Sequence, residues 1–223
     1  MLELKVDFSK DGIESATVSG QFDKAVSFLK SNGYGIVSLP INTHLRIVAG
    51  IKTPVTKKGN YLSHGFAYAK DAYPLFLRES PLVADPNLAE LAVNANNQGM
   101  YFITDNDLYK RSLAIANDEK GIEPFKRRVL VLPSKEPFKL SGTDNPEIFE
   151  GIFGEHGREY LEFLEMDSLT FYPVKTDEIN SERTLLTQMW FGKRHGPSRS
   201  NLCGNDIKLN RLGSVRGIKK VST

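Results

Sequence analysis

Residues 189–218 read MWFGKRHGPSRSNLCGNDIKLNRLGSVRGI, and this stretch decides how the rest of the chain is interpreted. Thr184–Phe191, which leads into it, is rich in β-branched and aromatic residues, and this composition predicts a strand. Gly192–Gly213 has no hydrophobic period and is dense in Gly, Ser, Asn, Asp, Arg and Lys, so we expect a long loop. Loops longer than about 12–15 residues in a compact domain are usually functional or disordered. Val215–Val221 predicts a closing strand that returns the chain to the fold.

The same segment carries the basic charge of the protein. Residues 193–220 hold eight Lys and Arg against one acid, Asp206, whereas the remainder has 21 basic and 26 acidic residues, a net charge of −5. A basic segment of this kind suggests an RNA- or DNA-binding protein. Its bidentate phosphate contacts would come from Arg194, Arg199, Arg211 and Arg216. Against this alternative, no Phe, Tyr or Trp follows Phe191, so the stacking surface expected of a single-strand binder is missing.

Length and composition describe an ordinary soluble globular chain: 223 residues, 40% hydrophobic and 25% charged, with a mean hydropathy of −0.32. No apolar run approaches the ~20 residues that a membrane helix needs, and Met1–Ser9 carries charges where a signal peptide would be apolar. We therefore expect no membrane span and, by default, a cytoplasmic protein. A single cysteine, Cys203, excludes an internal disulfide framework and a Cys-based zinc cluster.

Hydrophobic periodicity predicts one compact α+β domain without linkers or repeats. Helix starts are marked by Asp85-Pro86, Asp105 and Asn145-Pro146, and Asn32-Gly33 marks a left-handed helix stop. The expected strands are Met1–Phe8, Met100–Ile103, Arg127–Leu132, Ser168–Pro173 and Thr184–Phe191. The expected helices are Gln21–Ser31, Asp85–Gly99, Asn106–Asn117 and Asn145–Met166, with extended segments at Tyr34–Leu39 and Leu45–Ile51 and an irregular stretch at Thr53–Arg78.

Residue patterns that could support catalysis or metal binding are weak. Glu155-His156-x-x-Glu159 has the spacing of a metal site, but a second histidine at ligand spacing is missing and a charged solvated face explains the residues equally. Ser63-His64 and Ser200 lack the context of a nucleophile elbow, and no phosphate-binding glycine loop occurs. A hydrolase built on the Glu155–Glu159 or His64 regions would need a cleft that joins them. We therefore expect no enzyme, no catalytic residues, no cofactor and no obligatory metal.

The C-terminal segment resembles the variable region of diversity-generating retroelement variable proteins. The resemblance is carried by Met189-Trp190-Phe191, by Arg199–Asp206, by Leu209 and by Val215-Arg216-Gly217-Ile218. In that family a C-type-lectin-like domain ends in a hydrophobic-Trp motif, a polar loop of changing residues and a Val-Arg-Gly strand. The resemblance therefore implies a C-type-lectin-like α+β domain over residues 1–223, with mixed short antiparallel sheets, a few helices and long loops. It places the variable ligand-binding region at about residues 190–214.

The coding logic of these retroelements gives an internal check. Adenines in a template copy are randomised, so Asn codons change to many residue types but never to Lys, Trp, Met, Glu or Gln. The positions that this chemistry can reach, and that the resemblance assigns to ligand binding, are His195, Arg199, Asn201, Cys203, Asn205, Asp206, Asn210, Arg211 and Leu212. Met189, Trp190, Lys193, Lys208, Lys219 and Lys220 cannot be reached and are expected to be unvaried, although Lys193 and Lys208 lie inside the loop.

Between the variable positions the resemblance places a fixed scaffold of Trp190, Leu202, Gly204, Leu209, Val215, Arg216 and Gly217. The leucines would pin the loop by burial, and the glycines would permit close backbone approach. The resemblance also implies that the strands at Leu2–Phe8 and Val215–Val221 lie together. Calcium motifs of the lectin type are missing from the sequence. The partner implied is a variable protein or glycan, bound without covalent chemistry, and nucleic acid is the less favoured alternative.

Overall fold

The sheet is organised around β4 (Asn60–Tyr68) and β10 (Thr184–Phe191), which pair antiparallel near its middle. The computed structural model describes residues 2–174, 183–192, 201–204, 209–211 and 213–219. Among these residues the strands follow the order β1-β2-β12-β4-β10-β11-β9-β8, with β3, β5, β6 and β7 added along the path. The described strands join in one mixed sheet, in which β11–β9 and β12–β4 are parallel. Helices and a mixed sheet are present as expected, but the sheet is larger than the short antiparallel sheets that were predicted.

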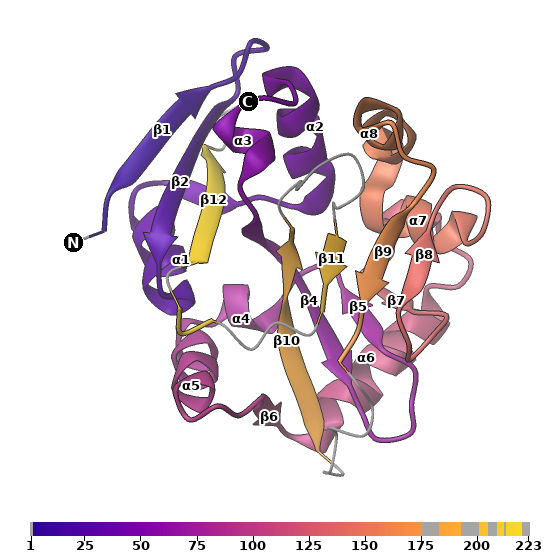
Figure 1. Cartoon of the computed structure of the whole chain (residues 1–223). Coiled ribbons are helices and arrows are strands. Elements are labelled where there is room, and N and C mark those ends of the chain that lie inside the picture. The colour runs from indigo at the N-terminus through magenta and orange to yellow at the C-terminus, as the bar shows by residue number, and fades with distance from the viewer. Residues whose placement is uncertain (1, 175–182, 193–200, 205–208, 212, 220–223) are drawn as a thin grey trace.

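The remaining elements have the following bounds (Figure 1). The strands are β1 (Leu4–Phe8), β2 (Glu14–Gly20), β3 (Tyr34–Ile36), β5 (Leu75–Leu77), β6 (Phe102–Thr104), β7 (Val129–Val131), β8 (Phe138–Leu140), β9 (Leu169–Tyr172), β11 (Asn201–Cys203) and β12 (Gly213–Lys219). The helices are α1 (Phe22–Ser31), α2 (Leu39–Ala49), α3 (Pro54–Lys57), α4 (Pro81–Ala84), α5 (Pro86–Asn97), α6 (Asn106–Asp118), α7 (Pro146–Phe153) and α8 (Gly157–Leu164), with 3-10 turns η1 (Pro124–Lys126) and η2 (Gly154–His156).

Helices with a clear cap or apolar stripe form as predicted. Helix α1 buries the face that contains Phe22 and Leu29, and Gly33 follows with φ of 83°. The Asp85 side chain accepts from the Asn87 amide, and Asp105 accepts from the Leu108 amide, so both carboxylates cap their helices. These helix ends depend on hydrogen bonds between residues that are close in sequence, so the residue types alone predict them.

Helix α2 replaces the extended segment predicted at Leu45–Ile51, so that prediction was wrong. The Ser38 hydroxyl caps the helix at the Ile41 amide, and Pro40 lies in the first turn. Proline is tolerated there because the first turn has no intrahelical acceptor for its nitrogen. Pro40 therefore belongs to the first turn of a helix and does not separate two extended segments.

The stretch Thr53–Arg78, predicted to be irregular, contains the central strand β4 and its neighbour β5. Strand β4 is buried along almost its whole length, so its residues show no alternation of apolar and polar types. The predicted helix Asn145–Met166 is divided into α7 and α8 at Gly154, whose φ is 63°.

Two hydrophobic clusters lie on opposite faces of the sheet. Alternate residues of β4 enter different clusters: Leu62 and Phe66 pack with α2, α7 and α8, whereas Tyr61 and Ala67 pack with α1, α5 and α6. This alternation follows from the two-residue period of a strand. The chain thus forms a helix–sheet–helix arrangement in which β10 and β12 lie in the interior of the sheet. Within the described ranges, no helix is long and apolar enough to cross a bilayer.

The first and last strands do not pair with each other. Strand β12 pairs antiparallel with β2, and β1 lies on the far side of β2 (Figure 1). The direct pairing of Leu2–Phe8 with Val215–Val221 was therefore wrong, because Glu14–Gly20 forms a strand between them that we had not predicted. Residues 220 and 221 lie outside the described part of the chain.

Candidate functional site

The candidate site is the region where β10 ends, because the predicted variable segment begins there. The Trp190 ring is partly buried and meets the Tyr61 ring edge-on, with centroids 4.7 Å apart. It also lies against Gly59, where an added Cβ would stand 2.4 Å from the indole. Phe191 is fully buried. Trp190 and Phe191 thus pack on opposite faces of the sheet and fix the end of β10.

A buried arginine from α2 holds the backbone at this point. The Arg46 guanidinium is completely buried and donates to the carbonyls of Phe191 at 3.5 Å and Gly192 at 3.3 Å. It donates to the Lys58 carbonyl at 3.2 Å and to the Tyr160 hydroxyl at 3.0 Å. The Arg46 Cζ atom also lies 3.8 Å from the centre of the Phe191 ring, which is a cation–π contact. Arg46 therefore ties the last residues of β10 to α2, α8 and the start of β4.

A second buried arginine extends this network to β12. Arg216 is 3% exposed, and its Nη1 donates to Asn42 Oδ1 at 2.9 Å. Asn42 in turn donates to Asn60 Oδ1 at 3.1 Å, and Asn60 Oδ1 also accepts from Arg46. Burial, together with the nearby positive charge of Arg46, lowers the pKa of Arg216 to about 10. Among the described residues, neither guanidinium forms a salt bridge with a carboxylate.

The next fixed point is β11 with the glycine that follows it. Leu202 is fully buried in the core, and Cys203 pairs with Trp190 across the strands and is partly exposed. The Gly204 amide donates to the Tyr172 carbonyl at 2.9 Å, and its own carbonyl accepts from the Tyr68 hydroxyl at 3.1 Å. A Cβ at Gly204 would stand 2.4 Å from that hydroxyl, so only glycine fits there without displacing its neighbours.

A third fixed point lies at residues 209–211, between α1 and α5. Leu209 is buried; its amide donates to Asn96 Oδ1 at 3.2 Å and its carbonyl accepts from the Phe22 amide at 2.9 Å. The Asn210 side chain donates to the Asn96 carbonyl at 3.0 Å. Arg211, the next residue, is exposed. The chain therefore passes from a buried to an exposed position within three residues.

Of the residues assigned from sequence, the scaffold set is described in full. Val215 is buried, and a Cβ at Gly217 would stand 2.8 Å from Tyr34 Cβ. Of the ligand-binding set, Cys203, Asn210 and Arg211 are described, and Asn201 lies in β11, although its side chain is not described. His195, Arg199, Asn205, Asp206 and Leu212 lie outside the described residues, as do Lys193, Arg194, Lys208 and Lys220.

Arg46, Asn42 and Asn60 were missed by sequence reasoning. Charged and amide side chains are mostly exposed, so no rule from composition places them in a core. The one available signal is that Arg46 lies between Leu45 and Ile47, among apolar residues of α2.

The two alternative chemical sites are not brought together. His64 is buried; its Nε2 accepts from the Leu39 amide at 2.9 Å and its Nδ1 donates to the Arg78 carbonyl at 2.5 Å. Both ring nitrogens are thus occupied by backbone groups, which gives His64 a structural role. His156 instead faces His44, with ring centroids 5.0 Å apart.

His44 and His156 share a pocket of about 430 Å³ between α2, η1, α7 and η2. Arg78, Glu150 and Glu155 line the same pocket, and Ile13, Pro40 and Phe125 give it apolar walls. His44 Nε2 lies 2.5 Å from Asp11, and His156 Nδ1 lies 3.4 Å from Glu159. Within the described ranges, no group of three or more His, Cys, Asp or Glu is arranged to hold a metal ion.

Comparisons with known proteins identify the fold. No protein-family model matches the chain, and no curated protein matches it. A solved structure, described as "Accommodation of massive sequence variation in Nanoarchaeota by the C-type lectin fold", superposes with a TM-score of 0.60. The alignment covers 95% of this chain and 99% of that chain, at 13% sequence identity. The protein therefore has a C-type lectin fold, the same fold as that nanoarchaeal protein.

Replacing Arg46 by Met should lower the free energy of unfolding by about 3 kcal/mol, because several buried carbonyls lose their donor at once. Arg158→Met, at an exposed position of α8, is the matched control and should change stability by less than about 0.5 kcal/mol. Urea unfolding measures both. Equal stability of the two variants would show that Arg46 does not hold the end of β10.

Burial lowers the pKa of His64 to about 4, against about 6.5 in the unfolded chain. The unfolded state therefore binds more protons between these values, so stability is fully present above pH 6.5 and is lost as the pH falls towards 4. We expect the free energy of unfolding to fall by about 2 kcal/mol from pH 6.5 to 5.0. His64→Gln should remove this slope, whereas His156→Gln should retain it. Denaturant titrations at several pH values test both, and an unchanged slope in His64→Gln would refute the assignment.

Proposed function

We propose that this chain is a diversified ligand-binding protein of the retroelement type, in which the C-type lectin scaffold displays exchangeable residues of the segment 190–214. The ligand is a macromolecule, a protein or a glycan, recognised without covalent chemistry. Sequence supplies one support, the pattern that runs from Trp190 to Gly217. The fold supplies the other, since the structurally similar nanoarchaeal protein is described by massive sequence variation on a C-type lectin fold.

One observation carries the proposal: described, anchored residues flank two stretches that contain predicted exchangeable positions, His195 and Arg199 in the first and Asn205 and Asp206 in the second. Residues 193–200 begin after Gly192, whose carbonyl is held by Arg46, and end at β11, where Leu202 is buried. Residues 205–208 lie between Gly204, held by Tyr172 and Tyr68, and the buried Leu209. These fixed ends belong to the core of the described chain.

In this arrangement the residues that stabilise the fold are different from those proposed to contact the ligand. Truncation of a buried leucine costs about 2–5 kcal/mol, whereas most surface substitutions change stability by less than about 0.5 kcal/mol. A scaffold anchored at Leu202, Gly204 and Leu209 therefore keeps its fold while neighbouring side chains change. Cys203 needs no redox role in this scheme, because its codon is one of those that adenine randomisation reaches.

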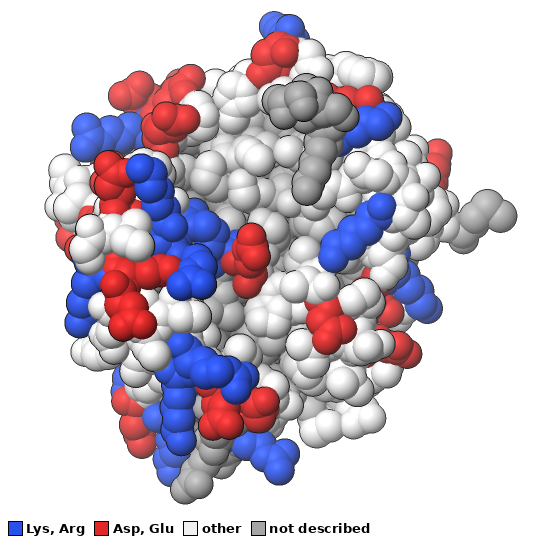
Figure 2. Space-filling model, turned by 180° about the vertical axis from the view of Figure 1, so that it is seen from behind, with Lys and Arg blue, Asp and Glu red and all other residues white. Residues whose placement is uncertain are grey.

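The nucleic-acid alternative is weakened by the position of its proposed contacts. Arg216 was expected to bind phosphate in that hypothesis, but its guanidinium is buried under Asn42 and Val55. Lys219 lies 3.2 Å from Glu14 and is thereby paired with a carboxylate. In the view of Figure 2, the Lys and Arg side chains of the described residues are interspersed with Asp and Glu.

Exchangeable and anchoring positions should separate clearly in a stability series. Arg211→Ser and Cys203→Ser should each change the free energy of unfolding by less than about 0.5 kcal/mol. Leu209→Ala should cost about 2–5 kcal/mol, and Gly204→Ala about 1–3 kcal/mol because its methyl group would overlap Tyr68. Chemical denaturation measures all four. Large losses in the first pair would contradict the division.

The retroelement itself is tested in the genome that encodes the chain. We expect a near-copy of the codons for about residues 187–218 beside a reverse transcriptase gene, differing from this gene at adenines. Binding to nucleic acid is tested separately by titrating the salt concentration with RNA and DNA oligonucleotides. A log–log salt slope that is steep and is lost on charge removal at Lys193 and Arg194 would favour the alternative. Absence of the near-copy would reject diversification while leaving the binding measurement informative.

A further inference from the structure

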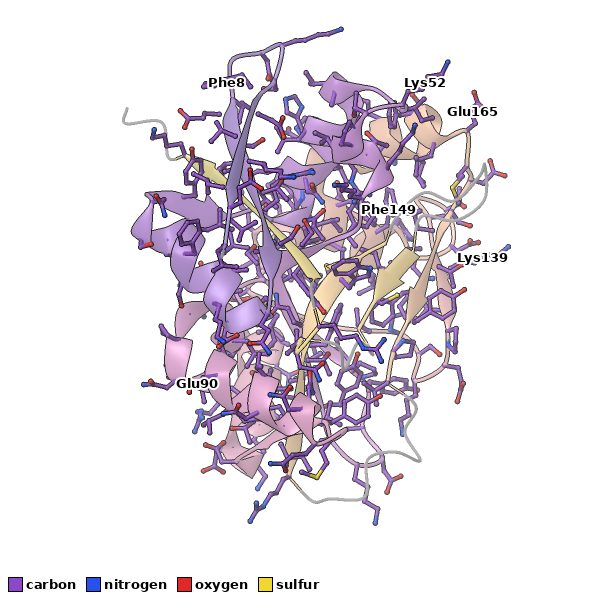
Figure 3. The ribbon with its side chains drawn as sticks, turned by 60° about the vertical axis from the view of Figure 1, so that its left-hand side comes forward. Phe8, Lys52, Glu90, Lys139, Phe149 and Glu165 are labelled. Carbon is purple, nitrogen blue, oxygen red and sulfur yellow. The ribbon has the colours of Figure 1, made fainter. Side chains whose placement is uncertain are left out.

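The outer edge of β1 has no strand partner among the described residues. Among the described strands, β1 lies at one end of the sheet order and pairs only with β2. Two apolar side chains on it are exposed: Val6 is 42% exposed and Phe8 is 72% exposed. Figure 3 labels Phe8 at the outer end of the strand, and Figure 1 shows β1 at the margin of the fold. Open edges of this kind are templates for pairing with another strand.

The backbone groups that face this edge can be identified from the register. Phe8 lies opposite Glu14 and Asp7 lies opposite Ser15, and at the turn the Ser9 amide donates to the Ile13 carbonyl at 3.0 Å. Residues of an antiparallel pair alternate between those bonded to the partner strand and those whose N–H and C=O point away. Since Ser9 bonds inward, the odd-numbered residues of β1 bond to β2. The N–H and C=O groups of Leu4, Val6 and Phe8 therefore point outward.

The sequence of β1 is complementary to itself in one antiparallel register. When two copies are aligned about Val6, Leu4 of one copy lies opposite Phe8 of the other, and Lys5 lies opposite Asp7. The outward-facing backbone groups of Leu4, Val6 and Phe8 then meet one another as hydrogen-bonded pairs. Alignment about Lys5 or Asp7 would place like charges opposite each other, and a one-residue shift would place apolar side chains opposite charged ones.

We propose that the edge of β1 is the interface of a symmetric homodimer, in which β1 pairs antiparallel with β1 of a second copy about Val6. An edge lysine ordinarily discourages strand pairing. Here Asp7 of the second copy neutralises Lys5, and the two-fold axis repeats this ion pair. The exposed Phe8 gains an apolar neighbour in Leu4 of the second copy. This self-complementarity favours a second copy of the chain over a strand from an unrelated protein.

The dimer edge is separate from the end of β10. Strands β2, β12 and β4 separate β1 from β10 in the sheet, so the pairing edge and the end of β10 do not compete. A dimer would carry two copies of the ligand surface, which raises avidity for ligands that present repeated sites.

Sedimentation velocity over a range of protein concentrations tests the proposal. The wild-type chain should reach a dimer, and Lys5→Glu or Asp7→Lys alone should raise the dissociation constant about tenfold or more by placing like charges opposite each other. The double variant Lys5→Glu/Asp7→Lys restores the ion pair with reversed sign and should restore dimerisation. Lys139→Glu, at an exposed position of β8 at the other end of the sheet, is the control and should have no effect.

A second variant tests the backbone. Val6→Pro removes the N–H at the two-fold axis and should abolish the dimer, while thermal unfolding shows that the monomer still folds, because proline is tolerated where the strand N–H faces outward. A wild-type chain that stays monomeric overturns the proposal. So does a dimer that is insensitive to all of these substitutions, or one in which the double charge reversal fails to rescue the single variants.

Discussion

The buried guanidinium of Arg46 is the interaction on which the candidate site depends. Burying a cation without a carboxylate is unfavourable, because the lost hydration must be replaced by hydrogen bonds. The planar guanidinium has five N–H donors. Here Nη1 and Nη2 reach carbonyls of the chain before β4 and at the end of β10, whereas the buried Nε has no partner among the described residues. A lysine has no such fork and could not bond these separate segments together. The cost of burial is therefore offset by joining segments that are distant in sequence.

Arg216 of β12 is a second buried guanidinium that is stabilised by hydrogen bonds. These bonds explain how an arginine is accommodated at the centre of a strand. Its partner is Asn42 from α2, which shares Asn60 with Arg46, so one amide pair lies between two buried cations. An amide side chain can donate and accept hydrogen bonds at the same time. Asn42 and Asn60 can therefore link two guanidinium groups whose positive charges would otherwise repel each other. The end of β10 and the last described strand are consequently positioned by the same helix, and movement of α2 would disturb both.

The sequence was informative where an interaction is local and misleading where it depends on tertiary burial. The α1 stripe, the caps at Asp85 and Asp105, and the strand before Gly192 all follow from neighbours within a few residues. Strand β4 shows no alternation of apolar and polar residues because both of its faces are buried. Arg46 could not be assigned to the core because charged side chains are usually exposed. At the candidate site the spacing of Leu202, Gly204 and Leu209 could be recognised, whereas the arginine that holds Phe191 and Gly192 could not.

The contacts of Gly204 indicate how an anchor can stay fixed while its neighbours change as we propose. Its carbonyl accepts from Tyr68 of the central strand and its amide donates to Tyr172, so the backbone itself, and not a side chain, makes the attachment. Backbone attachments do not depend on the identity of adjacent residues. The main chain of Leu209 is likewise held by Phe22 of α1 and Asn96 of α5, and the Asn210 carbonyl accepts from the Gln21 side chain. A surface held by its backbone transmits little of a side-chain change into the core. Such a surface can vary in chemistry while its shape stays constant, which is the condition that diversified recognition requires.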